Sequence, residues 1–205
     1  MDILQKSKNK QRRIGLTGGI ASGKTTITNY IRKHKNIPIL DADKLSRELI
    51  KPNTYGYKKI LDYFGNKIID NKNNSEKEIN RKLLRSIIFK HSESKVWIEK
   101  LLHPLIKEKM IKECGQYTNN QTIVLVIPLL FEAKFEDICT EIWLVKCPKE
   151  LQKKRLITRD KISEKEAYEL INLQLSFEEK REFSDIILEK SDDQNKWINT
   201  IKELL

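Results

Sequence analysis

The chain has 205 residues, 39% of them hydrophobic, and a formal net charge of +11 at pH 7. This size and apolar content fit one globular domain, with room for an insertion, and exclude a disordered chain. No segment reaches the roughly 18 consecutive apolar residues of a membrane span, and the N-terminal residues lack the apolar stretch of a secretion signal. We therefore expect a cytoplasmic protein without a membrane partner.

The distribution of the basic residues and the spacing of the cysteines indicate which kinds of binding site the chain lacks. The chain has 31 Lys and only 9 Arg, and the lysines are spread along its whole length. A nucleic-acid interface needs a concentrated basic stripe, so the pattern favours a solvated surface and no nucleic-acid partner. Cys114, Cys139 and Cys147 show no C-x-x-C spacing, which predicts free thiols rather than a zinc site or a disulfide framework.

The first expected elements are a strand, a loop and a helix. Residues 1–12 have the composition of a basic polar tail, and residues 13–17, with Ile14 and Leu16, that of a buried strand. Residues 18–25 then read Gly-Gly-Ile-Ala-Ser-Gly-Lys-Thr, which is the pattern G-x-x-x-x-G-K-[ST]. Apolar residues recur at helical spacing after it and predict a helix over residues 24–34.

This unit predicts a site for the phosphates of a nucleotide. The glycines let backbone N–H groups of the loop turn toward phosphate oxygens, and the positive end of the helix dipole points at the same anion. Lys24 has the reach for the β and γ phosphates, and the Thr25 hydroxyl suits Mg²⁺. The alternative is a glycine-rich turn that binds no ligand.

Two aspartates follow the next expected strand, residues 37–40. Asp41 and Asp43 come directly after its apolar residues, and the carboxyl ends of neighbouring parallel strands face one crevice, where the phosphate loop also lies. A carboxylate there accepts the proton of an attacking hydroxyl or assists Mg²⁺ through water. Asp41 is the first candidate for the proton acceptor. Either aspartate has the alternative role of capping a helix that starts near residue 44.

A long segment separates the second and third expected strands. Residues 44–121 are too many for one crossover helix and show helical periodicity, which predicts an inserted helical substructure. The expected helices span residues 44–50, 55–64, 76–89, 92–102 and 104–114. They are separated by Pro52, Gly65, an Asn-rich turn at residues 71–74, and Pro104.

The rest of the chain completes an α/β pattern. The apolar run at residues 122–127 predicts a central strand, and further strands are expected over residues 141–146 and 185–188. Two helical patterns lie on either side of residues 159–161, and a last helix is expected over about residues 193–205. Five strands that alternate with helices predict a five-stranded parallel sheet covered on both faces.

Gln152, Arg155 and Arg159 share one face of the expected helix that begins near residue 149. Such a row fits a lid whose guanidinium groups neutralise a transferring phosphoryl group, and a solvated basic face is an equal alternative. The third strand ends at residues 127–132 without a Walker B aspartate, and the chain has no N-K-x-D, which argues against a GTPase switch. A small-molecule kinase needs a second binding site, for which the helical insertion supplies the material.

These motifs together resemble the dephospho-CoA kinase family along nearly the whole chain. Residues 14–20 and 22–26 (IGLTGGI and SGKTT) are similar to its phosphate loop, and residues 41–43 with Arg47 are similar to its D-A-D segment. Four further motifs correspond to Asn80-Arg81 with Leu84 and Phe89, to Leu102-His103-Pro104 with Ile106, to residues 128–132 (PLLFE), and to Gln152, Arg155 and Arg159 followed by Gln174.

The resemblance implies ATP-dependent phosphorylation of the ribose 3′-hydroxyl of dephospho-CoA, the last step of coenzyme A synthesis. The implied fold is a P-loop α/β core of the adenylate-kinase type, made of residues 13–43 and 122–205. The implied insertion, residues 44–121, binds the acceptor, and the implied lid spans about residues 149–176. ATP with Mg²⁺ and dephospho-CoA are the expected small-molecule partners of a monomer or small homo-oligomer.

The resemblance also assigns roles to single residues. The catalytic residues would be Lys24, Asp41, Asp43 and Arg155. ATP would contact Gly18, Gly19, Ile20, Ala21, Ser22, Gly23, Lys24, Thr25, Thr26 and Arg159, with Thr25 as the Mg²⁺ ligand. The acceptor would contact Thr17, Asp41, Arg47, Arg81 and His103, although a packing or capping role for His103 is an equal alternative. Ala21 stands where the family usually has glycine, so we expect a φ below zero there.

Two rival functions stay open. One is a kinase of the same fold that acts on a nucleoside or nucleoside monophosphate, against which the L-x-H-P and P-L-L-F-E segments argue. The other is a P-loop protein that binds nucleic acid and hydrolyses ATP slowly, against which the dispersed lysines argue.

Overall fold

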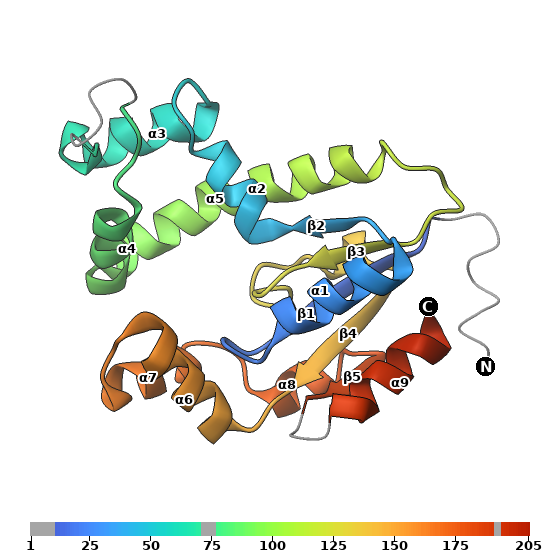
Figure 1. Ribbon diagram of the computed structural model, residues 1–205. Coiled ribbons are helices and arrows are strands. Elements are labelled where there is room, and N and C mark those ends of the chain that lie inside the picture. Colours follow the sequence, from blue (N-terminus) through green and yellow to red (C-terminus); the bar gives the residue numbers. More distant parts are fainter. Residues whose placement is uncertain (1–10, 71–76, 191–193) are drawn as a thin grey trace. The chain divides into compact units, whose positions relative to one another are not determined.

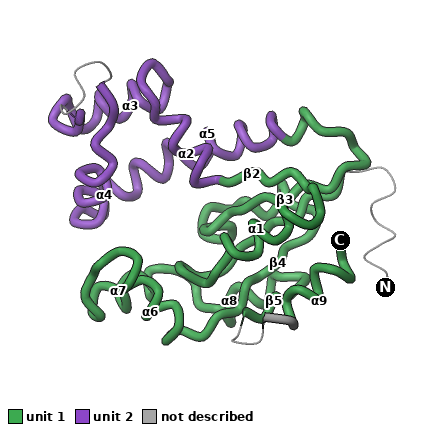
Figure 2. Tube along the Cα trace, viewed as in Figure 1, with its two compact units in different colours: residues 1–41, 114–205 green, residues 42–113 purple. Residues whose placement is uncertain are grey.

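The computed structural model describes residues 11–70, 77–190 and 194–205 and divides into two compact units (Figure 2). The first unit comprises the chain up to residue 41 and residues 114–205, and the second comprises residues 42–113. Each unit has a hydrophobic core of its own. Among the described residues, no helix has both the length and the apolar character that crossing a membrane requires.

The first unit is built on the predicted five-stranded parallel sheet (Figure 1). Its strands are β1 (Arg13–Gly18), β2 (Ile39–Asp41), β3 (Ile123–Val126), β4 (Glu141–Lys146) and β5 (Ile186–Glu189). They lie in the order β2-β3-β1-β4-β5, and all neighbouring pairs are parallel. Every residue of β3 is buried, as a continuously apolar strand inside such a sheet requires.

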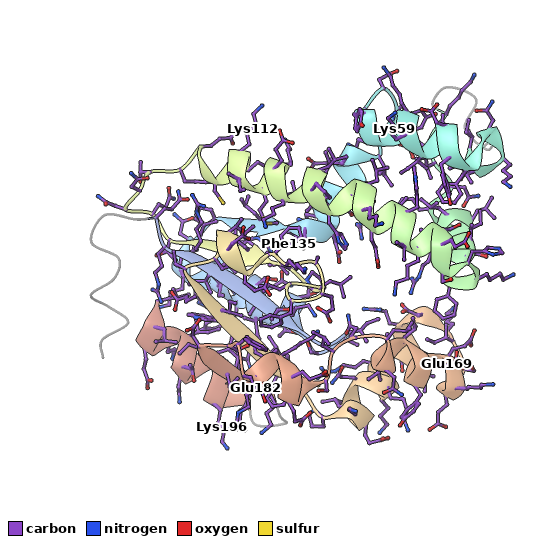
Figure 3. All side chains as sticks on the ribbon, turned by 180° about the vertical axis from the view of Figure 1, so that it is seen from behind. Lys59, Lys112, Phe135, Glu169, Glu182 and Lys196 are labelled. Carbon is purple, nitrogen blue, oxygen red and sulfur yellow. The ribbon has the colours of Figure 1, made fainter. Side chains whose placement is uncertain are left out.

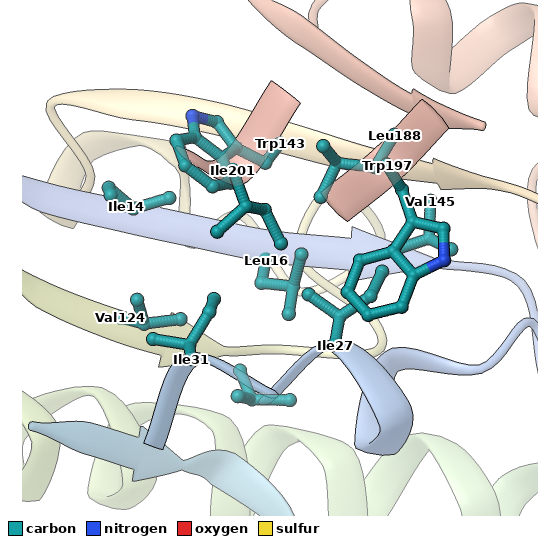
Figure 4. Packing of buried hydrophobic residues seen from close by; sticks show 11 residues of the cluster. Ile14, Leu16, Ile27, Ile31, Val124, Trp143, Val145, Leu188, Trp197 and Ile201 are labelled. Carbon is teal, nitrogen blue, oxygen red and sulfur yellow. The ribbon is translucent and has the colours of Figure 1, made fainter. Parts of the chain in front are cut away.

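One face of this sheet is covered by α1 (Lys24–Lys35) and α9 (Gln194–Leu204). Alternate residues of β1 point to opposite faces, so Ile14 and Leu16 both face these helices. They pack there with Ile27 and Ile31 of α1 and with Trp197 of α9 (Figure 4). The same core fixes where β1 ends and α1 begins, and it therefore supports the loop between them.

Three more helices complete the first unit: α6 (Lys149–Asp160), α7 (Glu164–Asn172) and α8 (Phe177–Arg181). A 3-10 turn, η3 (Glu136–Ile138), precedes β4. The helices predicted on both sides of residues 159–161 are α6 and α7, whereas α8 was not predicted. Leu156, Ala167 and Ile171 form the core between α6 and α7, and Ile20 and Ala21 of the phosphate loop pack against it.

The second unit consists of α2 (Ala42–Leu49), α3 (Tyr55–Phe64), the 3-10 turn η2 (Asn66–Ile68), α4 (Arg81–Lys90) and α5 (Ser92–Cys114). The last residue of α5, Cys114, belongs to the first unit. Its core joins Tyr57, Ile60 and Phe64 of α3 to Leu84 of α4 and Ile98 of α5. The Thr54 hydroxyl accepts from the Tyr57 amide and so caps α3.

Pro104 does not separate two helices, which corrects the expectation of a break there. Instead, α5 runs without interruption through the proline. A proline inside a helix removes one backbone hydrogen bond and normally kinks or ends the helix. Buried residues before and after it, Ile98, Ile106 and Met110, hold both halves in packed surroundings, and such packing supplies most of the stability of helices in proteins.

Two helix starts also differ from the sequence prediction. α4 begins at residue 81 rather than 76, because Asn80 caps it by accepting from the Leu83 amide and because Ile79 forms an antiparallel bridge with Ile69. α2 begins at Ala42, two residues before the predicted start. Glu76 and the Asn-rich turn expected at residues 71–74 lie outside the described residues.

Gln11 and Arg12 pack against other parts of the first unit, which corrects the expected tail of residues 1–12 for its last two residues. Gln11 is buried, and its Nε2 donates to the Cys114 carbonyl at 3.0 Å. The Arg12 guanidinium pairs with Glu141 at the start of β4 and donates to the Leu204 carbonyl at 2.8 Å. Residues 1–10 lie outside the described residues.

Lysine side chains extend from several elements of both units. Lys59 of α3, Lys112 of α5 and Lys196 of α9 are exposed and point away from the ribbon (Figure 3). This agrees with the interpretation of the lysines as a solvated surface.

Candidate active site

The phosphate loop follows β1 at the carboxyl edge of the sheet. Gly18 has φ +146° and Gly23 has φ +99°, which are conformations that side chains rarely adopt. A Cβ on Gly18 would also lie 2.9 Å from the Val145 carbonyl oxygen. The Ser22 amide donates to the Gly19 carbonyl at 3.1 Å and closes the turn. Two of the predicted glycines are therefore required by backbone geometry.

Ala21 has φ +56°, so the expectation of a negative φ is wrong. A left-handed conformation costs an L-residue about 1–2 kcal/mol. Part of that cost is offset here, because Ala21 packs against the core between α6 and α7. The loop thus keeps the conformation that glycine favours, and the alanine methyl group packs against the core between α6 and α7.

The beginning of α1 is suited to an anion. Its N-cap is Gly23, so no side chain of the described residues caps the helix by a hydrogen bond, and its first turn holds no acidic residue. The first N–H groups of such a helix are available to a phosphate, which the helix dipole also attracts. Lys24 turns its ammonium back over the loop and donates to the carbonyls of Gly18 at 2.6 Å and Gly19 at 2.9 Å.

Thr25 and Thr26 are exposed in the first turn of α1, and Thr25 lines a cavity with Ala21 and Gly23. Mg²⁺ prefers oxygen ligands, takes few of them from the protein and several from phosphates and water. The Thr25 hydroxyl fits that requirement. Among the described residues there is no group of three His, Cys, Asp or Glu that could hold a metal ion by itself.

The segment predicted to be a lid, residues 149–176, contacts the phosphate loop through α6. Arg155 donates from Nη1 to the Ala21 carbonyl at 3.1 Å, and Gln152 donates from Nε2 to the Cys147 carbonyl at 2.8 Å. Arg159 is exposed and holds Asp160 through two hydrogen bonds of 2.7 and 2.8 Å. The three side chains predicted to share one face of α6 therefore have different surroundings. Gln152 is buried, Arg155 contacts the loop, and Arg159 is exposed.

A cavity of about 570 Å³ lies between this helix and the loop. Its lining comprises Ala21, Gly23, Thr25, Leu151, Lys154, Arg155, Thr158 and Arg159. Three of these residues are cationic and no residue of the lining is anionic. The cavity combines backbone N–H groups with arginines, which is a suitable environment for a polyphosphate.

Two residues of this region were not predicted from the sequence. Lys190 directly follows β5 and is 8% exposed. Its Cε is so close to Gly23 that a Cβ added to the glycine would lie 2.4 Å from it. Burial, and then the nearby charge of Arg155, lowers the pKa of Lys190. Burial raises the pKa of the Cys147 thiol, against the opposing effects of Arg155, Lys190 and Lys24. The signal in the sequence was position, because Cys147 directly follows one predicted strand and Lys190 lies two residues after another, at the edge of the sheet that carries the loop.

Asp41 is the last residue of β2 and pairs with Val126 of β3, which also pairs with Leu16 of β1. β3 therefore lies between β1 and β2, so the expectation that β1 and β2 are neighbouring strands is wrong. Asp41 and Leu16 are two strands apart, which is about 10 Å at ordinary strand spacing. Both strands nevertheless end at the same edge of the sheet, as parallel strands require.

Thr17 was expected to contact the acceptor. Its side chain is buried, and its hydroxyl donates to the Pro128 carbonyl at 3.3 Å. That hydrogen bond joins β1 to the P-L-L-F-E segment that follows β3. A contact between Thr17 and the acceptor stays a prediction.

The helical unit holds the other predicted site residues. Asp43 is exposed in the first turn of α2, after the N-cap position, where a carboxylate is favoured by the helix dipole. Arg47 and Arg81 are exposed. His103 lies within α5, and burial lowers its pKa although Glu99 acts in the opposite direction. The two arginines thus remain accessible to a negatively charged ligand.

Comparison with known proteins identifies the family. The sequence model of dephospho-CoA kinase matches residues 12–196. Dephospho-CoA kinases of Prochlorococcus marinus strain MIT 9312 and of P. marinus subsp. pastoris are 88% and 62% identical over 205 residues, the full length of both chains in each pair. The solved structure of a dephospho-CoA kinase from Campylobacter jejuni is 28% identical, with a TM-score of 0.69 over 94% of this chain and 96% of that one. The chain belongs to the dephospho-CoA kinase family.

Proposed function

We propose that the phosphate loop, Asp41 and the lid arginines together carry out the reaction of this family, in which ATP phosphorylates dephospho-CoA in the final step of coenzyme A synthesis. The observation that carries the assignment is the loop itself, with an uncapped helix start, Lys24 over its carbonyls and Arg155 on its Ala21 carbonyl. Such a site binds the phosphates of ATP.

The chemistry follows from these positions. The oxygen of the ribose 3′-hydroxyl forms a bond to the γ phosphorus of ATP, the bond to the β-phosphate oxygen breaks, and ADP leaves. Asp41 orients the hydroxyl and accepts its proton, while Lys24 and Arg155 stabilise the charge on the transferring group and on ADP. Thr25 would hold Mg²⁺, which supplies further neutralisation of phosphate charge when it is bound.

We assign the acceptor side to the helical unit. Arg47 and Arg81 are the cations for the phosphates of dephospho-CoA, because both are exposed and arginine binds phosphate bidentately. His103 contributes a neutral imidazole, and Asp43 assists Mg²⁺ through water. Arg159 contributes to ATP binding from the lid, since it lines the cavity beside the loop.

Substrate choice is tested by one assay. Purified protein and MgATP are mixed in turn with dephospho-CoA, adenosine, AMP and CMP, and ADP release and the product mass are followed. Dephospho-CoA alone should stimulate ADP release and gain one phosphoryl group. Stimulation by a nucleoside or nucleoside monophosphate instead would support the rival kinase. Salt-dependent retention on DNA or RNA, without stimulation by any acceptor, would support the nucleic-acid-binding rival.

We also propose a cytoplasmic location and a monomer or small homo-oligomer. The three cysteines are free, which suits a reducing compartment. Light scattering of the purified protein measures its oligomeric state.

A further inference from the structure

The end of the lid is joined to the phosphate loop by two neighbouring residues. Residues 173–176 connect α7 to α8 and are called the hinge segment here. Within it, the Gln174 Oε1 accepts a hydrogen bond from the Ile20 amide of the phosphate loop at 2.7 Å. The next amide, that of Leu175, donates to the Glu132 Oε1 at 3.1 Å. The hinge segment therefore contacts both the phosphate loop and the P-L-L-F-E segment, to which no role was assigned above.

Glu132 is held in place by a buried lysine. The Nζ of Lys180, in α8, lies 2.8 Å from the Glu132 Oε1, and the Lys180 side chain is 1% exposed. In the described part of the chain the ammonium has no hydrogen bond of good geometry, so charge rather than alignment joins the pair. A buried ammonium that loses its partner is strongly destabilising. The carboxylate is thereby kept at the position where it accepts from Leu175.

A short rigid element joins this anchor to the hinge segment. Ser176 and Glu179 form a capping box at the start of α8, with the Ser176 amide donating to Glu179 at 2.7 Å and the Glu179 amide donating to Ser176 at 3.2 Å. The Lys180 amide donates to the Ser176 carbonyl at 3.2 Å. One helical turn thus links the buried ion pair to the residues that contact the loop.

We propose that Glu132 is a positioning residue for ATP binding. By holding the Leu175 amide, Glu132 places Gln174 so that its side-chain oxygen fixes the Ile20 amide and with it the conformation of the phosphate loop. A loop that is fixed before ATP arrives loses less conformational freedom on binding. The inference rests on the proposed binding of ATP by this loop.

The contact with the loop is tested by Gln174→Met, which keeps the length of the side chain and removes its acceptor. Gln174 is only partly buried, so the variant should fold. Loss of one hydrogen bond should speed hydrogen exchange of the Ile20 amide about fivefold and raise the Kd and KM for ATP by about the same factor. The KM for dephospho-CoA should stay unchanged.

The role of Glu132 is tested in a Lys180→Met background, so that replacing Glu132 does not leave the buried ammonium of Lys180 without its partner. Glu132→Gln with Lys180→Met retains an acceptor for Leu175 and should bind ATP about as tightly as the wild type. Glu132→Leu with Lys180→Met has no acceptor and should match Gln174→Met. Adding Gln174→Met to that pair should cause no further loss, because both changes act on the same contact.

A matched control separates positioning from stability. Glu141 forms another partly buried ion pair, with Arg12, at the start of β4 and away from the strand end that leads into the lid. Glu141→Gln should lower the free energy of unfolding without changing the Kd for ATP or the exchange of the Ile20 amide. A shift of ATP affinity in this control equal to that of Glu132→Leu with Lys180→Met would assign the effect to stability and overturn the proposal.

The remaining outcomes are also decisive. Wild-type ATP affinity and unchanged Ile20 exchange in both Gln174→Met and the Glu132→Leu pair would overturn the positioning role and leave the proposed function intact. A wild-type protein that binds no ATP would overturn the proposed function, and this inference with it, before any variant is made.

Discussion

An alanine at position 19 would bring the phosphate loop into collision with one side chain of α6. A Cβ on Gly19 would lie 2.5 Å from Oε1, 3.3 Å from Cδ and 3.5 Å from Nε2 of Gln152. These three nearest atoms all belong to Gln152. Gly19 does not have a positive φ, so alanine adds no backbone strain there. The effect of Gly19→Ala is therefore the effect of this one contact.

The size of the effect follows from how Gln152 is held. Ordinary contact distances require its oxygen to withdraw by roughly 1 Å. Gln152 is buried, and its Nε2 donates to the Cys147 carbonyl at 2.8 Å, a bond that such a shift would break. Because a buried hydrogen bond is lost and its carbonyl is left without that donor, we expect Gly19→Ala to lower the free energy of unfolding by about 1–2 kcal/mol.

A double-mutant cycle with Gln152→Ala tests this reasoning by urea unfolding of the four proteins. The shorter side chain removes the collision, so Gly19→Ala in that background should be neutral or stabilising by up to about 1 kcal/mol, because alanine restricts the unfolded chain more than glycine does. An equal cost of Gly19→Ala in both backgrounds would refute the reasoning. It would show that the alanine disturbs the loop by a route other than Gln152.

Three further predictions concern single residues. Lys24→Met should lower kcat by about 10²–10³-fold in an ADP-release assay while the Tm stays near that of the wild type, and turnover within tenfold of the wild type would remove Lys24 from the mechanism. Burial raises the pKa of the Cys139 thiol from its usual 9 to about 12, so the stabilisation that comes from the neutral thiol is lost as the pH rises above 9. Urea unfolding of Cys139→Ala should show a smaller fall in the free energy of unfolding above pH 9, and an unchanged fall would contradict the burial. Burial lowers the pKa of His103, so the stabilisation that comes from its neutral imidazole is lost as the pH falls below about 6.5. The midpoint of its NMR titration should lie below 6.5, and a higher midpoint would contradict the burial of this side chain.

The sequence predicted best those features that depend on local pattern. The unit of β1, loop and α1 was placed within a residue or two at each end, because Ile14, Leu16, Ile27 and Ile31 carry the periods of a strand and a helix. Predicting all five strands and their parallel direction required only the alternation of apolar runs with helical segments.

Features that depend on long-range packing were not predicted. The position of β3 between β1 and β2 comes from strand pairing that no local pattern encodes. Continuation of α5 through Pro104 depends on burial on both sides of it. Ala21 takes a positive φ because the loop geometry overrides its own preference.

The candidate site shows the same division. Motif spacing identified Lys24 and Thr25, whose role depends on a loop that is local in sequence. Lys190 lies beside Gly23 only because β5 ends at the same edge of the sheet as β1, more than 160 residues away along the chain. The contact of Gln174 with Ile20 is equally non-local, so the family motif marked Gln174 without indicating what it touches.

The central claim is that the loop binds the triphosphate of ATP while Asp41 orients and deprotonates the acceptor hydroxyl. Single-turnover and steady-state kinetics of Asp41→Asn, with the Kd for ATP measured on the same protein, test it most directly, and Asp43→Asn measured in parallel assigns the two carboxylates. We predict that Asp41→Asn lowers kcat by about 10²-fold or more and leaves the Kd for ATP unchanged. A kcat within tenfold of the wild type, or a change confined to ATP affinity, would contradict the account.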